Sequence, residues 1–302
     1  MNAIQRIKAS GGFRKGFVRF FTKGRANRSV GGTLFLLFFI ACFGAFSLFP
    51  VLFMVGNAFK PMHELYRYPP TILPENPSAQ NFSDLLQYAN ESLVPFTRYV
   101  FNTGILILVG CIGQIILSAM AAFPLAKFEF KGRGFLSNLV VYALMFSGAV
   151  TAVPNYIIMN YLGLMDSLWA VLLPALASTL GLYLLQNFMT MLPDSLIEAA
   201  QIDGASYFRT LVQVIMPVVK PAWMTVFIFT FQNLWGNTGG SFLYTENIKP
   251  LSYMLSKIAA AGISRQGMAS AASLLMFIIP VVIFIIAQSN VMETMATSGM
   301  KD

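Results

Sequence analysis

The residue types that carry out catalysis or ion coupling are sparse in this chain of 302 residues. There is one histidine, His63, and the Cys, His, Asp and Glu residues show no spacing typical of a metal site. The sequence has no G-x-x-x-x-G-K-[ST] loop to cradle nucleotide phosphates and no Ser/His/Asp set of a hydrolase. The apolar runs hold almost no ionisable residues, which disfavours a proton- or sodium-coupled carrier. The sequence therefore indicates neither an enzyme nor a carrier with its own energy source.

Composition places the chain in a membrane. Hydrophobic residues make up 56% and charged residues only 11%, against roughly 25% charged residues in soluble domains. The net charge of +8 is concentrated at the start, where no acid accompanies the basic side chains Arg6, Lys8, Arg14, Lys15, Arg19, Lys23, Arg25 and Arg28. This pattern is typical of a cytoplasmic tail beside an anionic leaflet. Without an aromatic platform it does not favour nucleic-acid binding.

Six apolar segments can each supply a membrane span of ~20 residues. We expect an all-α integral membrane protein with spans at 33–55, 99–126, 134–153, 167–191, 221–235 and 268–291, the last kinked at Pro280. A Pro-rich connection over 56–98 is predicted to hold one short amphipathic helix near 81–88. With both termini in the cytoplasm, 14 of the 20 Lys and Arg residues fall on the cytoplasmic side.

Three regions follow from this arrangement. They are a basic cytoplasmic tail over 1–32, a six-span domain over 33–292 and a cytoplasmic tail over 293–302.

The segment 193–221 is predicted to form a helix–turn–helix on the cytoplasmic side. Ser195 and Glu198 have the spacing of a capping box for a helix that ends near Ile202. Asp203-Gly204 supplies a turn and a new cap, because glycine tolerates a positive φ and aspartate accepts amide hydrogen bonds. A second helix begins near residue 205 and ends before Pro217, since proline lacks the amide proton that a helix interior needs.

This segment carries a spaced motif. Glu198-Ala199-Ala200, Gly204 and Val214-x-Met216-Pro217 resemble the EAA loop of permease subunits of binding-protein-dependent ABC importers. In that family the pattern is E-A-A, three residues, G, nine residues and I-x-L-P, so Val214 and Met216 are conservative departures. Beyond the basic tail, nearly the whole chain is similar to the second permease chain of the carbohydrate-uptake, maltose-type family. Further matching pieces are Pro154-x-Tyr156, Leu162-Gly163-Leu164, Trp235, Lys249-Pro250-Leu251 and the tail from Glu293 to Lys301, which resembles an oligosaccharide subgroup.

The resemblance implies that the loop docks on a separate ATP-hydrolysing subunit. The residues expected to couple are Glu198, Ala199, Ala200, Asp203, Gly204 and Pro217. The chain itself would be non-catalytic and hold no cofactor or metal, with ATP and Mg bound by partner subunits. Its partners would be a sister permease, two ATPase copies and an extracytoplasmic solute-binding lipoprotein, in a bacterial plasma membrane. The alternative is that Glu198 only closes its capping box and Asp203 only caps a helix.

Candidates for the substrate path are Asn233, Trp235, Gln232 and Tyr183, because amides hydrogen-bond sugar hydroxyls and aromatic rings stack on sugar rings. The same residue types also join helices to one another or form interfacial belts. This alternative applies to the other span amides, Asn102, Gln114 and Gln186.

The expected function is translocation of an oligosaccharide delivered by an extracytoplasmic binding protein and driven by ATP. One alternative is an ABC importer permease for another small solute, a polyol or a glycerol phosphate ester. Others are a stand-alone secondary carrier or channel, which would need an intramembrane carboxylate or a pore ring, and a membrane scaffold whose basic tail is the functional part.

Overall fold

The computed structural model describes residues 30–91 and 94–298, so residues 1–29 of the predicted basic tail and the end of the C-terminal tail lie outside the described residues. All regular elements in these ranges are helical. The chain divides into two compact units, one ending at Phe53 and one beginning at Met54. The long apolar helix α2 (Val30–Phe59) accounts for the described part of the first unit.

Four helices are long and apolar enough to cross a membrane: Leu34–Phe59, Phe96–Lys127, Leu168–Thr190 and Gln266–Gln288. Two bent helix pairs raise this number to six if each pair is one span. The expected all-helical membrane architecture is thus confirmed at the level of four to six candidate spans among the described residues.

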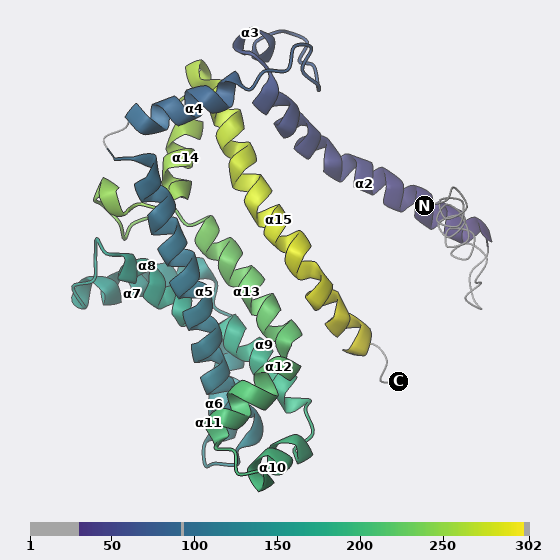
Figure 1. The fold of residues 1–302 in the computed structure, drawn as a ribbon, viewed down its shortest axis with the longest axis vertical. Coiled ribbons are helices and arrows are strands. Elements are labelled where there is room, and N and C mark those ends of the chain that lie inside the picture. The colour runs from purple at the N-terminus through teal and green to yellow at the C-terminus, as the bar shows by residue number, and fades with distance from the viewer. Residues whose placement is uncertain (1–29, 92–93, 299–302) are drawn as a thin grey trace, which may run out of the picture. The chain divides into compact units, whose positions relative to one another are not determined.

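Helix α5 (Phe96–Lys127) is the central element of the second unit. It packs against α8 (Leu168–Leu176), α9 (Thr179–Thr190), α13 (Lys220–Trp235) and α14 (Leu251–Ala259). It runs from the end of the unit where α14 and α4 (Gln80–Glu91) lie to the end where α10 (Ser195–Ile202) lies (Figure 1). We name these the α14 end and the α10 end.

Close packing around α5 depends on small residues. A Cβ at Gly110 of α5 would stand 2.3 Å from the side chain of Leu234 in α13. One at Gly181 of α9 would stand 2.5 Å from Nε2 of Gln114. Both glycines therefore allow neighbouring helices to approach α5 more closely than any other residue would, as is common among membrane helices.

Helices break where the sequence pattern predicted continuous spans. α6 (Arg133–Leu144) and α7 (Gly148–Tyr161) meet at 108°, so a single straight span over 134–153 is wrong. Ser147 is extended at the break, whereas Pro154 lies inside α7. The predicted span 167–191 exists but is interrupted between α8 and α9, where Ser178 is extended.

The connection 56–98 is more ordered than a loop. It contains α3 (Met62–Leu65), which holds the exposed His63, and α4, which confirms and extends the predicted amphipathic helix. Buried polar groups shape it: Glu64 accepts the amide protons of Glu75 (3.0 Å) and Asn76 (2.9 Å). The long final helix α15 (Gln266–Ser298) packs on α4, α13 and α14 and contains Pro280.

Candidate functional site

The first helix of the candidate coupling segment is α10. The predicted capping box needs Ser195 as the cap, but the helix begins one residue earlier than that. Asp194 occupies the cap position and makes no side-chain cap bond, while Ser195 is the first helical residue. Glu198 is therefore one position beyond the residue that could reach back to the cap, and it is exposed. The predicted capping box is wrong, and it does not account for Glu198.

The turn after α10 is a Schellman motif, which ends a helix with one residue at positive φ. Gly204 has φ +79°, as predicted, and its amide donates to the carbonyl of Gln201 (2.9 Å). The amide of Ala205 donates to the carbonyl of Ala200 (2.9 Å). A Cβ at Gly204 would meet no atom within 4 Å, so the turn faces open space.

The second helix begins and ends differently from the prediction. Ser206, and not Asp203, caps α11 (Tyr207–Thr210), because its hydroxyl accepts the amide proton of Arg209 (3.3 Å). The helix then continues through Pro217 as a π-helical turn, η1 (Leu211–Ile215), and α12 (Met216–Val218). In this π-turn the amide of Met216 donates a hydrogen bond to the carbonyl of Leu211, five residues back. The helix is therefore wider just before the proline. The chain turns by 83° only after Val218, into α13.

The α10 loop, residues 191–219, divides its motif between two faces. Ile197, Leu211 and Ile215 pack into a core with Ala122 and Leu185 of α5 and α9. Ala200 is also buried, so it supports the loop from inside. The motif residues on the outer face are Glu198, Ala199, Asp203, Gly204 and Pro217, which are exposed together with the large apolar side chains of Ile202 and Phe208.

A cavity of about 530 Å³ lies where the helices break. Its walls come from the α6–α7 bend, the α8–α9 break, α5 and α13. Its polar lining residues are Gln114, Thr151, Asn155, Ser178, Thr179, Thr230 and Asn233. The lining side chains are all neutral. Non-helical backbone at membrane depth is tolerated where it lines such a cavity. The cavity therefore accounts for the position of the helix breaks.

The four residues predicted to line the substrate path do not all lie at the cavity. Asn233 lines the cavity. Trp235 is buried, stacks on Phe231 (ring centroids 5.9 Å apart) and donates its indole proton to the carbonyl of Met276 (2.9 Å). Gln232 is exposed and Tyr183 half-buried, and neither is among the lining residues. The structure thus brings one of the four to the cavity.

Of the residues that line the cavity with Asn233, sequence reasoning weighed Gln114 among the span amides but did not select Thr151 or Asn155. Gln114 accepts the hydroxyl proton of Thr230 (2.7 Å), which joins α5 to α13 at the cavity wall. Gln186 donates to Ser137 (2.9 Å) and joins α9 to α6. Thr151 and Asn155 are four residues apart on α7, so both lie on the same helix face. That spacing is the signal that could have found them.

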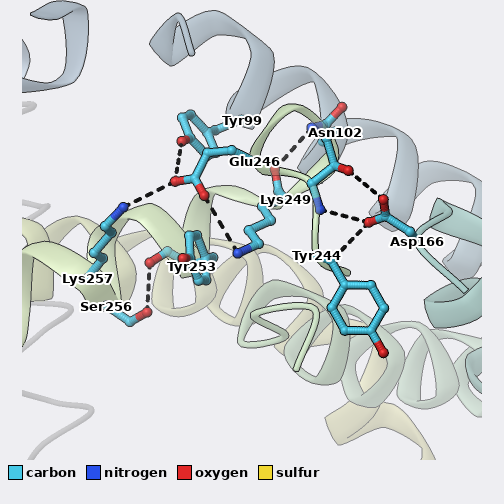
Figure 2. Close-up of polar contacts among 10 residues, drawn as sticks. Tyr99, Asn102, Asp166, Tyr244, Glu246, Lys249, Tyr253, Ser256 and Lys257 are labelled. Atoms are coloured by element: carbon cyan, nitrogen blue, oxygen red, sulfur yellow. Dashed lines mark hydrogen bonds and ion pairs between the residues drawn. The ribbon is translucent and has the colours of Figure 1, made fainter. Parts of the chain in front are cut away.

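At the α14 end, the residues after α13 form a second loop, the α14 loop, over 236–250. Figure 2 shows how polar side chains hold it. The buried amide of Asn102 in α5 donates to the carbonyls of Asn247 (2.9 Å) and Lys249 (3.0 Å). Asp166, the non-glycine residue with positive φ (58°) in the described chain, accepts the amide protons of Tyr244 (2.7 Å) and Thr245 (2.8 Å) and the Thr245 hydroxyl.

The carboxylates of this loop are stabilised in their charged forms. The side-chain and backbone hydrogen bonds from Thr245, with that of Tyr244, lower the pKa of Asp166 below its ordinary value. Burial raises the pKa of Glu246, but the hydrogen bond and charge of Lys257, with Tyr99 and Lys249, outweigh it and lower the pKa overall. Both carboxylates that hold the α14 loop, Asp166 from outside it and Glu246 within it, therefore have their partners inside the chain.

The described residues contain no group of three or more His, Cys, Asp and Glu side chains that could hold a metal ion. The two features with functional geometry are the outer face of the α10 loop and the neutral cavity.

Comparisons with known proteins place the chain in a family. The chain is 29% identical over 224 residues to Protein LplC of Bacillus subtilis (strain 168), covering 74% of each. It is 30% identical over 182 residues to YtcP of the same strain, a polygalacturonan/rhamnogalacturonan transport system permease protein, covering 56% of this chain and 63% of the relative.

A crystal structure of a bacterial ABC transporter involved in the import of the acidic polysaccharide alginate shares the fold. Its TM-score is 0.75 at 19% identity, over 87% of this chain and 98% of that one. Residues 25–294 match the family model for the inner membrane component of binding-protein-dependent transport systems. The chain is thus a multi-pass membrane protein that belongs to this family of permease subunits.

Proposed function

We propose that this chain is the permease subunit of an ATP-driven importer that moves an uncharged oligosaccharide through its cavity. The observation that carries the proposal is the neutral, hydrogen-bonding lining of a space of about 530 Å³. Small-molecule sites have volumes of about 300–1,000 Å³. Amide and hydroxyl groups such as those of Asn155, Asn233 and Thr151 match the donors and acceptors of a sugar.

The side chains of the lining also favour a saccharide over one rival solute, the glycerol phosphate ester. A glycerol phosphate ester is an anion, and proteins bind phosphate with Arg, Lys or a helix N-terminus. The lining contains no Arg or Lys, although the first turns of α7 and α9 do lie in its wall. The relative YtcP is named for polygalacturonan and rhamnogalacturonan transport, which supports the saccharide class, although these polymers carry uronic-acid carboxylates and do not bear on the charge of the substrate.

Energy would enter through the α10 loop. Glu198, Ala199 and Gly204 lie on an exposed surface with Ile202, and Gly204 leaves room for a close approach. An exposed carboxylate beside apolar side chains suits a protein partner better than water alone. In this proposal the partner is an ATPase subunit, present in two copies, and the complex also contains a sister permease and an extracytoplasmic solute-binding lipoprotein.

The proposed topology has six spans, with both termini and the α10 loop in the cytoplasm of a bacterium. Two observations support it. The α10 loop and the α14 loop lie at opposite ends of α5 (Figure 1), and α5, at ~1.5 Å per residue, is long enough to cross a bilayer.

The substrate proposal is tested by uptake into proteoliposomes that contain the sister permease, the ATPases and the binding protein. Asn233→Ala should lower uptake of a neutral oligosaccharide several-fold while ATP hydrolysis continues. Gln232→Ala, an adjacent amide outside the lining, is the matched control. Equal uptake of glycerol phosphate, or equal effects of the two variants, would contradict the proposal.

The coupling proposal is tested by the double variant Glu198→Lys with Gly204→Val in the same vesicles. Uptake should be lost while the protein remains in the membrane, because the changes lie on the exposed face of the α10 loop. Unchanged uptake in this variant would rule out a coupling role for the loop.

A further inference from the structure

The single lysine at the end of α5 lies in an unusual position for a charged side chain. Lys127 is the last residue of α5, and its side chain is only 5% exposed. Its ammonium donates to the carbonyl of Leu192 (2.5 Å) and to the carboxylate of Asp194 (2.7 Å). Both acceptors belong to the segment that leads into α10. The burial of a charge is costly unless it is paired and hydrogen-bonded, so this contact fixes the start of the α10 loop.

Aromatic packing reinforces the same attachment. The ring of Phe128, the next residue, meets Phe123 of α5 edge-on at 5.2 Å and Tyr207 of α11 at 4.8 Å between centroids. α5 therefore holds the α10 loop at two points, one before α10 and one after it.

The other end of α5 holds the α14 loop, which follows α13. Asn102 donates to the carbonyls of Asn247 and Lys249, and the hydroxyl of Thr103 accepts the amide proton of Leu251 (2.8 Å). Between the two ends, the hydrogen bond from Thr230 to Gln114 joins α13 itself to α5. α5 thus fixes the chain before, within and after α13.

We propose that Lys127 is a positioning residue that makes the α10 loop and α5 move as one body, so that a displacement of the loop reaches the cavity and the α14 loop. Because charge-assisted hydrogen bonds are stronger than neutral ones, this contact transmits a displacement that an unattached loop would not pass on to α5. The inference rests on the proposed function, because in that function the ATPase partner displaces the α10 loop.

The same helix end offers a matched control. Arg133, the first residue of α6, donates to the carbonyls of Leu125 (3.0 Å) and Ala126 (2.9 Å). It is also a cation at the C-terminus of α5, where cations favour the helix dipole. Its hydrogen bonds reach α5 rather than the segment 192–194. Arg133→Met therefore removes a cation from the helix end without releasing the α10 loop.

The experiment compares Lys127→Met, Lys127→Arg and Arg133→Met in the reconstituted complex with the sister permease, ATPases and binding protein. We expect Lys127→Met to lower uptake per ATP hydrolysed about fivefold or more, within the usual range of coupling between sites. Amide exchange in the segment 192–202 should rise about tenfold or more, as expected when two charge-assisted hydrogen bonds are lost. Lys127→Arg should restore both values, and Arg133→Met should leave both unchanged.

Two failures are distinguishable. Uptake by the unaltered complex that does not depend on ATP would overturn the proposed function. ATP-driven uptake with an unchanged ratio and unchanged exchange in Lys127→Met would overturn only the role of Lys127. If Lys127→Met does not assemble, Asp194→Ala decides, because that side chain is 75% exposed. It should shift both readouts in the same direction by a smaller factor, and no shift overturns the role.

Discussion

The loops at the two ends of α13 use their carboxylates in opposite ways. At the α14 end, Asp166 and Glu246 accept hydrogen bonds or ion pairs from neighbouring backbone, hydroxyl and ammonium groups (Figure 2). At the α10 end, Glu198 and Asp203 are exposed on the surface. The carboxylates at the α14 end are thus paired within the chain, whereas the α10 loop pairs Asp194 with Lys127 and leaves its other two carboxylates exposed.

This difference separates structural from functional polar residues. A polar group whose partners lie within the chain contributes to folding, and its loss should appear as lost stability. A polar group that faces outward contributes little to folding, and its loss should appear only where a partner is present. The α14 loop is a scaffold by this criterion, and the α10 loop is a presenting surface.

The largest stability change is expected at Asn102. Asn102→Ala leaves the carbonyls of Asn247 and Lys249 without their buried donor, which should cost about 2–4 kcal/mol. Thermal or denaturant unfolding of the purified protein in detergent measures it. Asn233→Ala, the same change at an exposed amide, should stay within about 0.5 kcal/mol. Equal losses at both positions would break the distinction.

A smaller loss is expected at the turn after α10. Gly204→Val forces a β-branched residue into φ +79°, which should cost about 1–2 kcal/mol even though a Cβ there meets no atom within 4 Å. Gly204→Asn should recover most of this stability, since asparagine tolerates that backbone conformation. If Gly204→Asn is stable in unfolding experiments yet poor in uptake, the side chain obstructs a partner rather than straining the turn.

Acid should act on the α14 loop only at low pH. The lowered pKa of Asp166 means that its charged form stabilises the fold at pH values above 3.8, the ordinary value for aspartate, and that this contribution is lost as pH falls through the lower folded value. The difference in melting temperature between the unaltered protein and Asp166→Asn should be constant from about pH 5 to 8. It should shrink only below about pH 4. A difference that changes near neutral pH would contradict this assignment.

The smallest stability change is expected at Glu198. Glu198→Gln removes only an exposed charge and should alter the free energy of unfolding by less than about 0.5 kcal/mol. Under the proposed function it should still lower ATP-driven uptake in vesicles. A clear loss of stability would place Glu198 with the scaffold residues instead.

The sequence predicted long, uninterrupted helices well and broken ones poorly. Continuous apolar runs define α5 and α15 to within a few residues of the expected 99–126 and the start of 268–291. The α6–α7 bend was missed because Ser147-Gly148, a pair typical of turns, lies within the apolar run predicted as one span over 134–153. In the described chain Pro154 is simply accommodated within α7.

Within the candidate site, local signals predicted local structure. Gly204 was correctly assigned a positive φ, because only its own conformation was at issue. The predicted helix end before Pro217 is wrong. An upstream π-turn lets the helix continue past Pro217 although proline has no amide proton to donate, and no residue type signals such a turn in the sequence. The cavity could not be predicted, because it joins residues as distant in sequence as Gln114 and Asn233.

The neutrality of the cavity has a consequence for the electrical insulation of the membrane. An ion that entered would exchange its hydration shell for amide, hydroxyl and hydrocarbon groups with no opposite charge among the lining residues. Such a transfer is unfavourable in proportion to the charge, whereas a sugar loses only hydrogen bonds that the lining can replace. Under the proposed function, a passage of this kind would admit a bulky polar nutrient while holding back protons and sodium, so the voltage across the membrane would not be spent each time the transporter turns over.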